Sequence, residues 1–324
     1  MNRLLFICEK DRDHFAKPIL DAMDSKVKYS LYNSKFDYIR KYFLYNHIWI
    51  EWANRAAIDI TRIKLPFQKI VIRLHRYEMR HSLWMKKIKW KNVDSLVFVN
   101  TELMRQFQKN INNKVNCCVI PNAINMNDFP FSKRNEKNSV LSYGLEFHPI
   151  KAYDQLIKMF SKVVKIDPSF TLTIAGGEPR HEVYIDYYNK CKDLILKLNM
   201  FDNIKLKKLN VEVSDLKDHP NINKLLSEHN AIISYSDVES FHYAFAEGLS
   251  SGLSGFCRGW RELNPYEFWD AWCYNNEDKI ISGLLKWGKS TIEQRISIGQ
   301  KSREYIINNF SNLLISQKYM NLFK

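Results

Sequence analysis

Short apolar segments alternate with amphipathic segments along the chain, and this alternation most strongly limits the possible fold. In the first 130 residues, segments rich in β-branched and aromatic residues predict strands at 3–8, 26–32, 47–53, 69–75, 95–100 and 117–122. Helical patterns lie between several of them, at about 15–24 and at 101–110, where Thr101 is a credible N-cap. Strands that alternate with helices predict a parallel sheet covered on both faces.

The alternation starts again after the polar stretch "FSKRNEKNS" (131–139), which is typical of a linker. Further strands are predicted at 139–144, 170–177, 203–209 and 231–236, and helices at 152–166 and 184–199. The sequence therefore predicts an α/β protein with two doubly wound domains in tandem. Ligands of such a pair are expected at the carboxyl ends of the strands, in a cleft between the domains.

Length and composition fit this prediction. A chain of 324 residues is long enough for two domains. The six cysteines include no C-x-x-C pair, so we expect a reduced compartment and neither structural zinc nor a disulfide framework. The apolar run in "MNRLLFICEKDRD" is too short for a signal peptide, and no stretch approaches the ~18 apolar residues of a membrane span. We expect a soluble, cytoplasmic protein.

The net charge of +14 indicates an anionic partner. Nucleic acid, an anionic membrane surface and a phosphorylated small substrate all fit, and so does a generally basic surface with no specific role. The lysines are spread along the chain, and no nucleic-acid-binding module is evident, so nucleic acid is the least favoured partner.

The segment "DVESFHYAFAEG" (237–248) places two carboxylates, Glu239 and Glu247, in mostly apolar surroundings. With a helix starting near Ser240, Glu239 lies in the preceding turn and faces the cleft, and Glu247 lies about two turns into the helix. Free amides at the helix start would form an anion site, namely those of Phe241, His242 and Tyr243. The alternative is one acid that caps the helix and one on its surface.

In the first half, "IVIRLHRYE" (70–78) places His75, Arg76 and Glu78 at the tip of a buried strand, where catalytic groups of such sheets gather. An isolated histidine is often structural, and Arg76 and Glu78 can equally form an ion pair that fixes the turn. Trp49 and Trp52 line the same region and point to opposite faces of a regular strand. One can stack on an acceptor sugar while the other packs in the core.

Five segments, in order over residues 119–323, resemble retaining glycosyltransferases of the GT-B fold, especially glycosyltransferase family 4. They are "VIPNAINMNDF" (119–129), "SYGLEFHPIKAYDQLIKMF" (142–160), "LTIAGGEP" (172–179), "ESFHYAFAEGLSSGL" (239–253) and "NFSNLLISQKYMNLF" (309–323). The resemblance implies two Rossmann-like domains facing across a cleft. These are an acceptor-binding domain (1–133) and a nucleotide-sugar-binding domain (134–305). A C-terminal helix (306–324) would pack back toward the first domain.

The resemblance also implies roles for single residues. Glu239 would lie near the C3 and C4 hydroxyls of the donor sugar, Glu247 would bind the nucleotide ribose, and Lys151 would contact the diphosphate. His75 would face the donor sugar as a second catalytic residue. The other implied donor-site residues are Gly144, Gly177, Ser240, Phe241 and His242, and the implied acceptor-site residues are Trp52, Arg76 and Glu78.

The sequence departs from the family pattern at several positions. Leu145 stands where an arginine is usual, His242 replaces a glycine and Ser254 a proline, and "EKDRDHF" (9–15) replaces a glycine-rich loop. Without that arginine, another cation must balance the leaving diphosphate, and the candidates are Arg180, Arg258 and Arg261.

These features predict an enzyme that moves a sugar from a UDP- or GDP-sugar, with retention, to a glycan or lipid-linked glycan of a surface polysaccharide. No cofactor or metal is expected, because the one D-x-D, "DRD" (11–13), falls in the first βα loop. The positive charge would help the enzyme to dock as a peripheral protein on the inner face of an anionic membrane. The rivals are a GT-B enzyme that modifies nucleic-acid bases and a catalytically silent GT-B subunit that scaffolds a partner.

Overall fold

The structure, a computed structural model, describes residues 4–23, 27–80, 82–110, 115–209, 220–259 and 266–324. The chain forms two compact units. The first comprises Met1–Asn125 together with Asn309–Lys324, and the second comprises Met126–Asn308. The sequence-based domain boundary after residue 133 thus lies eight residues further along the chain than the division between the units.

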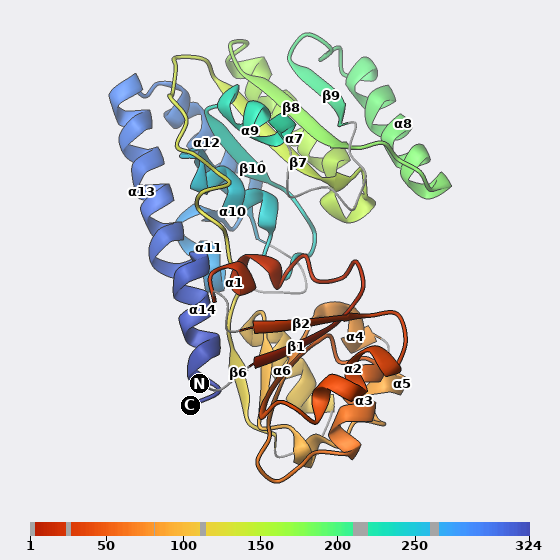
Figure 1. Ribbon diagram of the computed structural model, residues 1–324. Helices are drawn as coiled ribbons and strands as arrows, with labels where there is room; N and C mark the ends of the chain where they lie inside the picture. Colours follow the sequence, from red (N-terminus) through yellow and green to blue (C-terminus); the bar gives the residue numbers. More distant parts are fainter. Residues whose placement is uncertain (1–3, 24–26, 81, 111–114, 210–219, 260–265) are drawn as a thin grey trace. The chain divides into compact units, whose positions relative to one another are not determined.

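The first unit is built on a six-stranded parallel sheet with the strand order β2-β1-β3-β4-β5-β6. Figure 1 labels β1, β2 and β6 of this sheet. Its strands are β1 (Leu4–Glu9), β2 (Val27–Tyr32), β3 (His47–Glu51), β4 (Lys69–Leu74), β5 (Ser95–Phe98) and β6 (Cys117–Val119). Every pairing between them is parallel. Each strand predicted from the first half of the sequence is present, with its end shifted by up to three residues.

Both faces of this sheet are buried, which explains the nearly continuous apolar runs of its strands. Ile48 and Ile70 belong to one core cluster, whereas their chain neighbours Trp49 and Val71 belong to the cluster on the other face. The helices of this unit are α1 (Lys17–Asp21), α2 (Phe36–Tyr42), α3 (Arg55–Arg62), α4 (Arg76–Arg80), α5 (Ser82–Met85), η2 (Trp90–Asn92), α6 (Thr101–Asn110) and α14 (Asn312–Asn321).

The helix α14 completes the first unit although it lies almost 190 residues beyond Asn125 in the sequence. It packs against α1. The Tyr319 ring stacks on the Trp49 ring with 4.1 Å between centroids, and Ile315 and Phe323 belong to the same core cluster as Trp49. The side chains of α14 therefore form part of the core of the first unit.

The second unit has a six-stranded parallel sheet with the order β12-β11-β10-β7-β8-β9 (Figure 1). Its strands are β7 (Ser139–Glu146), β8 (Thr171–Gly177), β9 (Ile204–Leu209), β10 (Ala231–Ser234), β11 (Ser254–Arg258) and β12 (Cys273–Tyr274). Its helices are η3 (Pro149–Lys151), α7 (Tyr153–Ile166), α8 (Glu182–Lys197), α9 (Pro220–Ser227), α10 (Tyr243–Ser250), α11 (Tyr266–Trp269), η4 (Asp270–Trp272), α12 (Glu277–Gly288) and α13 (Ile292–Phe310).

The order of both sheets reverses direction beside a central strand, which is the pattern of a doubly wound fold. In the second unit, β7 is the parallel neighbour of β10. The connections that follow these two strands therefore begin side by side at the carboxyl edge of the sheet. Within the described residues, no helix is long and apolar enough to cross a membrane.

Candidate active site

The second unit brings Lys151 and Glu239 together at the carboxyl ends of two neighbouring strands. Lys151 ends η3, which follows β7, and Glu239 lies in the turn that links β10 to α10. The Lys151 Nζ donates to the Glu239 Oε1 at 2.6 Å. Both side chains remain partly open, with exposed fractions of 19% and 16%. This edge of a parallel sheet is where ligands of such folds bind.

Glu239 is held as an anion by its neighbours. The Ser236 hydroxyl donates to the same Oε1 at 2.9 Å, and the His242 Nε2 lies 3.9 Å from it. Burial by itself would raise the pKa of Glu239, but the charge of Lys151, the charge that His242 carries at low pH, and the hydrogen bonds from Lys151 and Ser236 outweigh it and lower the pKa to about 2. The carboxylate is therefore a permanent acceptor at neutral pH, suited to sugar hydroxyls.

His242 occupies a backbone conformation that favours glycine. Its φ is +70°, in the left-handed region that side chains with a Cβ rarely adopt. Its Nδ1 accepts a hydrogen bond from the Phe245 amide at 3.3 Å and so caps α10. Burial lowers the pKa of His242 to about 4, so the ring is neutral and its proton lies on the Nε2 that faces Glu239. His242 was expected to depart from the usual glycine, and the backbone at this position has a conformation that favours glycine.

The helix after β10 begins later than the sequence predicts. A start near Ser240 was expected, whereas α10 begins at Tyr243. The Phe241 ring packs against Phe268 and Trp269, with centroids 5.7 and 5.5 Å apart, and the Trp269 Nε1 donates to the Phe241 carbonyl at 3.0 Å. This aromatic packing holds Ser240 and Phe241 in the turn before the helix, so the predicted helix start was wrong by three residues.

Glu247 lies just beyond the first turn of α10, closer to its start than the two turns expected. The Tyr143 hydroxyl, from β7, donates to its Oε2. Burial raises the pKa of Glu247 to about 7, although the hydrogen bond from Tyr143 acts in the opposite direction. Near neutral pH this carboxyl therefore changes between an acid that can donate and a carboxylate that only accepts.

The two glycines of the predicted donor site lie on neighbouring strands. Gly144 is in β7, and a methyl group in place of its hydrogen would lie 3.1 Å from the Lys151 Cε. Gly177 ends β8, where it pairs in register with Glu146 and Leu209. The structure thus brings Gly144 directly beside Lys151 and places Gly177 one strand further along the sheet.

Leu145 stands on the surface where an arginine was expected. Its side chain is 50% exposed at the end of β7. Of the three arginines considered as replacements, Arg258 is hydrogen-bonded to the Asp237 carboxylate, Arg180 is exposed beyond β8, and Arg261 lies outside the described residues. Lys151 is therefore the cation that the described residues place against Glu239.

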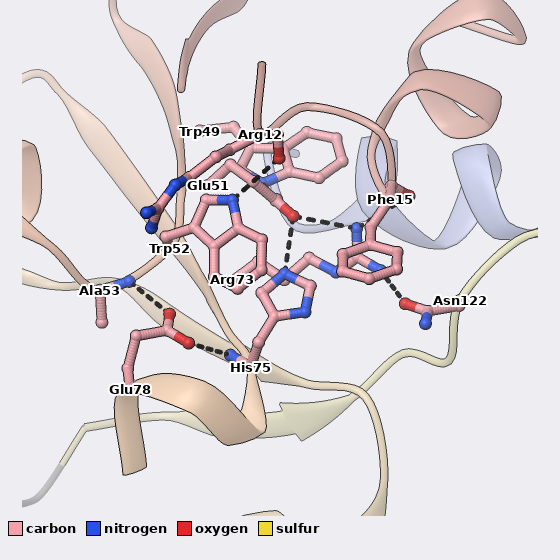
Figure 2. A network of polar contacts seen from close by, with 10 residues as sticks. All are labelled: Arg12, Phe15, Trp49, Glu51, Trp52, Ala53, Arg73, His75, Glu78 and Asn122. Carbon is pink, nitrogen blue, oxygen red and sulfur yellow. Dashed lines mark hydrogen bonds and ion pairs between the residues drawn. The ribbon is translucent and has the colours of Figure 1, made fainter. Parts of the chain in front are cut away.

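The first unit contains a second carboxylate–cation cluster, on β3 and β4 (Figure 2). Glu51 and Arg73 face each other in register, and the Arg73 Nη1 lies 3.3 Å from the Glu51 Oε1. The Trp49 Nε1 donates to the Glu51 Oε2 at 3.1 Å, and Arg73 also donates to the Asn122 Oδ1. Burial alone would raise the pKa of Glu51, but the Arg73 cation holds it below its usual value. Both charged side chains are fully buried.

His75 belongs to this cluster and is enclosed by aromatic rings (Figure 2). Its Nε2 lies 2.7 Å from the Glu51 Oε1. The Trp52 and Phe15 rings stack on it, with centroids 4.0 and 5.2 Å away. Burial lowers the pKa of His75, and only 6% of the residue is exposed. The predicted catalytic histidine is thus placed at the strand end, inside the protein.

Trp52 lies outside the strand on which it was predicted. β3 ends at Glu51 and not at residue 53, and Trp52 has a φ of +71°. Its Nε1 donates to the Arg12 carbonyl at 2.9 Å, which ties the turn after β3 to the loop after β1. The comparison of Trp49 and Trp52 on one regular strand was therefore wrong, because the backbone turns between them.

Glu78 fixes the turn after β4 through the backbone. Its carboxyl accepts the amide of Ala53 at 2.9 Å and that of His75 at 3.2 Å (Figure 2). Burial raises the pKa of Glu78 to about 8. Arg76, at the start of α4, is partly buried beside it. Glu78, one of the predicted acceptor-site residues, thus connects the turns that follow β3 and β4.

Glu51, Arg73 and Tyr143 are among the residues of these clusters that were not predicted from the sequence. A signal was present for the first two, since each is a charged residue at the end of an otherwise apolar strand, and buried charges are almost always paired. No such signal exists for Tyr143, because its partner Glu247 is 104 positions away.

Metal ligands do not gather in the described part of the chain. There, no group of three or more His, Cys, Asp or Glu side chains could hold a metal ion. Asp11 and Asp13 of the "DRD" segment lie in the loop after β1, with Asp11 exposed. All six cysteines are free.

Comparison with known proteins identifies the fold. No protein-family model and no curated protein matches the sequence. Among solved structures, the chain is similar to HepE of Anabaena in complex with UDP, with a TM-score of 0.76, 11% identity and 99% of each chain covered. It is also similar to a glycosyltransferase of Rickettsia africae, with a TM-score of 0.70, 14% identity and coverage of 100% of this chain and 98% of the other.

A third similar structure is TarM, known from S. aureus, with a TM-score of 0.64 and 15% identity over 86% of this chain. The chain spans about half of TarM, 54% of its length. At these identities the comparisons show the fold alone. The two parallel six-stranded sheets with their covering helices are those of the GT-B glycosyltransferases, and this chain has the GT-B fold.

Proposed function

We propose that the protein is a retaining glycosyltransferase that uses a nucleotide-sugar donor. The observation that carries the proposal is the partly open Lys151–Glu239 pair at the ends of β7 and β10, with Glu247 near the start of the next helix. The second unit thereby offers a cation, an ionised carboxylate and a second carboxyl within one short stretch of sheet edge. This set suits the diphosphate, the sugar hydroxyls and the ribose of a single donor.

The charges favour cleavage of the bond between the sugar and the diphosphate. Negative charge builds up on the departing nucleoside diphosphate, and fixed cations or dipoles at that position stabilise the transition state. Lys151 supplies the cation, and the amino end of α10 adds a favourable dipole. Lys151 is paired with Glu239, so donor binding would exchange that ion pair for contacts of each partner with the donor.

The donor that we propose is a UDP- or GDP-sugar, bound without a metal ion. UDP is favoured because HepE, of similar fold, was crystallised with UDP. Lys151 would take the charge-neutralising role that a metal ion has in other transferases. Undiminished transfer in the presence of EDTA is the expected result, and a requirement for Mg²⁺ or Mn²⁺ contradicts this part of the proposal.

The acceptor that we propose is a glycan or lipid-linked glycan of a surface polysaccharide, bound by the first unit. Arg76 and Trp52 remain the candidate acceptor contacts there. The enclosure of His75 between Phe15 and Trp52 favours a positioning role for its ring over direct contact with the donor sugar. The net charge of +14 supports a cytoplasmic protein that docks on an anionic membrane. Binding to phosphatidylglycerol vesicles that falls with added salt is expected, and binding independent of salt and of anionic lipid contradicts it.

The direct test is a screen of nucleotide sugars by thermal shift, followed by transfer assays with the donors that bind. An NMR spectrum of the product gives the anomeric configuration, and retention is expected. Inversion overturns the retaining mechanism but leaves the donor assignment intact. If no nucleotide sugar stabilises the protein, the proposal as a whole is wrong.

A catalytically silent GT-B subunit is the second candidate, favoured by the exposed Leu145 in place of an arginine. The same screen separates the two functions. A silent subunit is stabilised by a nucleoside diphosphate but shows neither donor hydrolysis nor transfer to any acceptor.

A further inference from the structure

The hydroxyl of Tyr153 is buried, and it has no role in the function proposed above. Tyr153 is the first residue of α7, two positions after Lys151, and it is 1% exposed. Within the described residues its hydroxyl has no hydrogen-bond partner. A buried hydroxyl without a partner destabilises a folded protein, so such a group calls for an explanation.

The position of this hydroxyl points to the donor site. A methyl group on Gly144 would lie 3.1 Å from the Tyr153 Oη, 3.1 Å from the Lys151 Cε and 3.7 Å from the Lys151 Nζ. The hydroxyl and the lysine side chain therefore lie over the same glycine of β7, and the missing side chain of Gly144 leaves them room. Burial raises the pKa of Tyr153, and the charge of Glu239 raises it further. The hydroxyl therefore keeps its proton and can donate a hydrogen bond to an acceptor.

We propose that the Tyr153 hydroxyl donates a hydrogen bond to a phosphate oxygen of the bound nucleoside diphosphate. This inference rests on the proposed function and adds a binding group to the same site. The Lys151 ammonium group contacts Glu239, and its Cε lies over Gly144 as the hydroxyl does. When Lys151 turns to the diphosphate, the hydroxyl gains an anionic acceptor beside the ammonium group. Tyr153, at the start of α7, thus supplies a hydrogen-bond donor near β7. The side chain of Leu145, which stands where an arginine was expected, cannot donate a hydrogen bond.

The test is the variant Tyr153→Phe, which removes only the hydroxyl. Because that hydroxyl has no partner among the described residues, we expect a melting temperature, measured without ligand, equal to or above that of the wild type. Binding of UDP or GDP, whichever binds the wild type, should weaken roughly 10-fold, as expected for the loss of a hydrogen bond to a charged group. Binding of the matching nucleoside, uridine or guanosine, should stay unchanged, since it has no phosphate.

Tyr38→Phe is the matched control. Tyr38 is also 1% exposed, but it lies in the first unit and its hydroxyl donates to the Asp59 Oδ2 at 2.9 Å. This variant should lose stability and bind the nucleoside diphosphate as the wild type does.

The outcomes separate the two proposals. If Tyr153→Phe binds the nucleoside diphosphate as tightly as the wild type, or loses as much stability as Tyr38→Phe, the inference about Tyr153 is wrong and the proposed function stands. If Tyr153→Phe weakens the binding of the nucleoside and of the nucleoside diphosphate equally, the inference is also wrong, because the lost contact is then not one with a phosphate. If the wild type binds neither UDP nor GDP, the proposed function fails and this inference fails with it.

Discussion

The two units each hold a carboxylate and a cation at the ends of adjacent parallel strands, yet the two pairs differ in their access to water. Glu51 and Arg73 are 0% exposed and share their remaining bonds with Trp49, His75 and Asn122. Lys151 and Glu239 are 19% and 16% exposed. The side chains of the buried pair are closed off from solvent, whereas water reaches the open pair, which can exchange its mutual contact for a ligand at little cost. The difference in burial fits a structural role for the first pair and the binding role that we propose for the second.

The largest expected effect is on stability, from breaking the buried pair. Arg73→Met leaves Glu51 as a buried charge without its cation and should lower the free energy of unfolding by about 3–5 kcal/mol. Lys151→Met, in the partly open pair, should lower it by less, because water reaches Glu239 and the Ser236 hydroxyl still donates to it. Urea denaturation of both variants measures the difference. Equal losses would remove the distinction between the two clusters.

The open pair should instead control activity. Lys151→Ala and Glu239→Gln should each reduce sugar transfer by about 100-fold or more, the size expected when a group that stabilises developing charge is removed. Their circular dichroism should match that of the wild type. Lys162→Ala is the control, because Lys162 pairs with Glu277 at the same distance of 2.6 Å on the exposed surface, and its activity should be unchanged. Near-normal transfer by both site variants contradicts the assignment.

The pH dependence of donor binding sharpens the comparison. Ribose hydroxyls donate to a carboxylate, and the pKa of Glu247 is raised to about 7. The affinity for a nucleoside diphosphate should therefore fall as the pH drops below 7, by up to tenfold per unit. Glu247→Gln should bind more weakly at pH 8 and lack this contribution. Calorimetric titrations of both proteins between pH 5.5 and 8.5 test this, and parallel profiles would contradict it.

In the first unit, pH should change stability and not binding. Burial raises the pKa of Glu78 to about 8, from 4.5 for an ordinary glutamate, so the folded protein keeps a proton that the unfolded chain loses. This contribution to stability is complete below pH 4.5 and is lost as the pH rises through 8. Glu78→Gln cannot lose a proton, so between pH 5 and pH 9 it should lose less stability than the wild type. Denaturation curves that shift equally for both proteins would refute this.

The sequence predicts the fold well because its evidence is local. Each segment predicted as a strand forms one, since β-branched and aromatic runs between polar turns carry that information within a few residues. β11 was not predicted, because "SGFCR" offers little apolar pattern. Its Gly255 is required by tertiary packing, since a methyl group there would lie 2.6 Å from the Trp272 ring. Such a contact cannot be deduced from the neighbouring sequence.

The candidate site was predicted in part. The resemblance to a known family indicated Glu239 and Lys151, and the structure places them in direct contact. The ion pair between Glu51 and Arg73 depends on the register between β3 and β4, which cannot be deduced from the sequence. The late start of α10 depends on the aromatic packing of Phe241. Long-range packing of this kind decides which predicted residues face solvent and which are enclosed.

The place of α14 has a consequence for how the protein is made. Its side chains Ile315, Tyr319 and Phe323 complete a core that the strands of the first unit begin to form some 300 residues earlier. During synthesis, the first unit therefore cannot close this core until the whole of the second unit has left the ribosome. In the meantime Phe6 and Trp49 lack the partner that covers them. The order of translation and the order of folding are thus opposed in this chain, and a nascent protein of this kind depends on protection of that apolar face until α14 arrives.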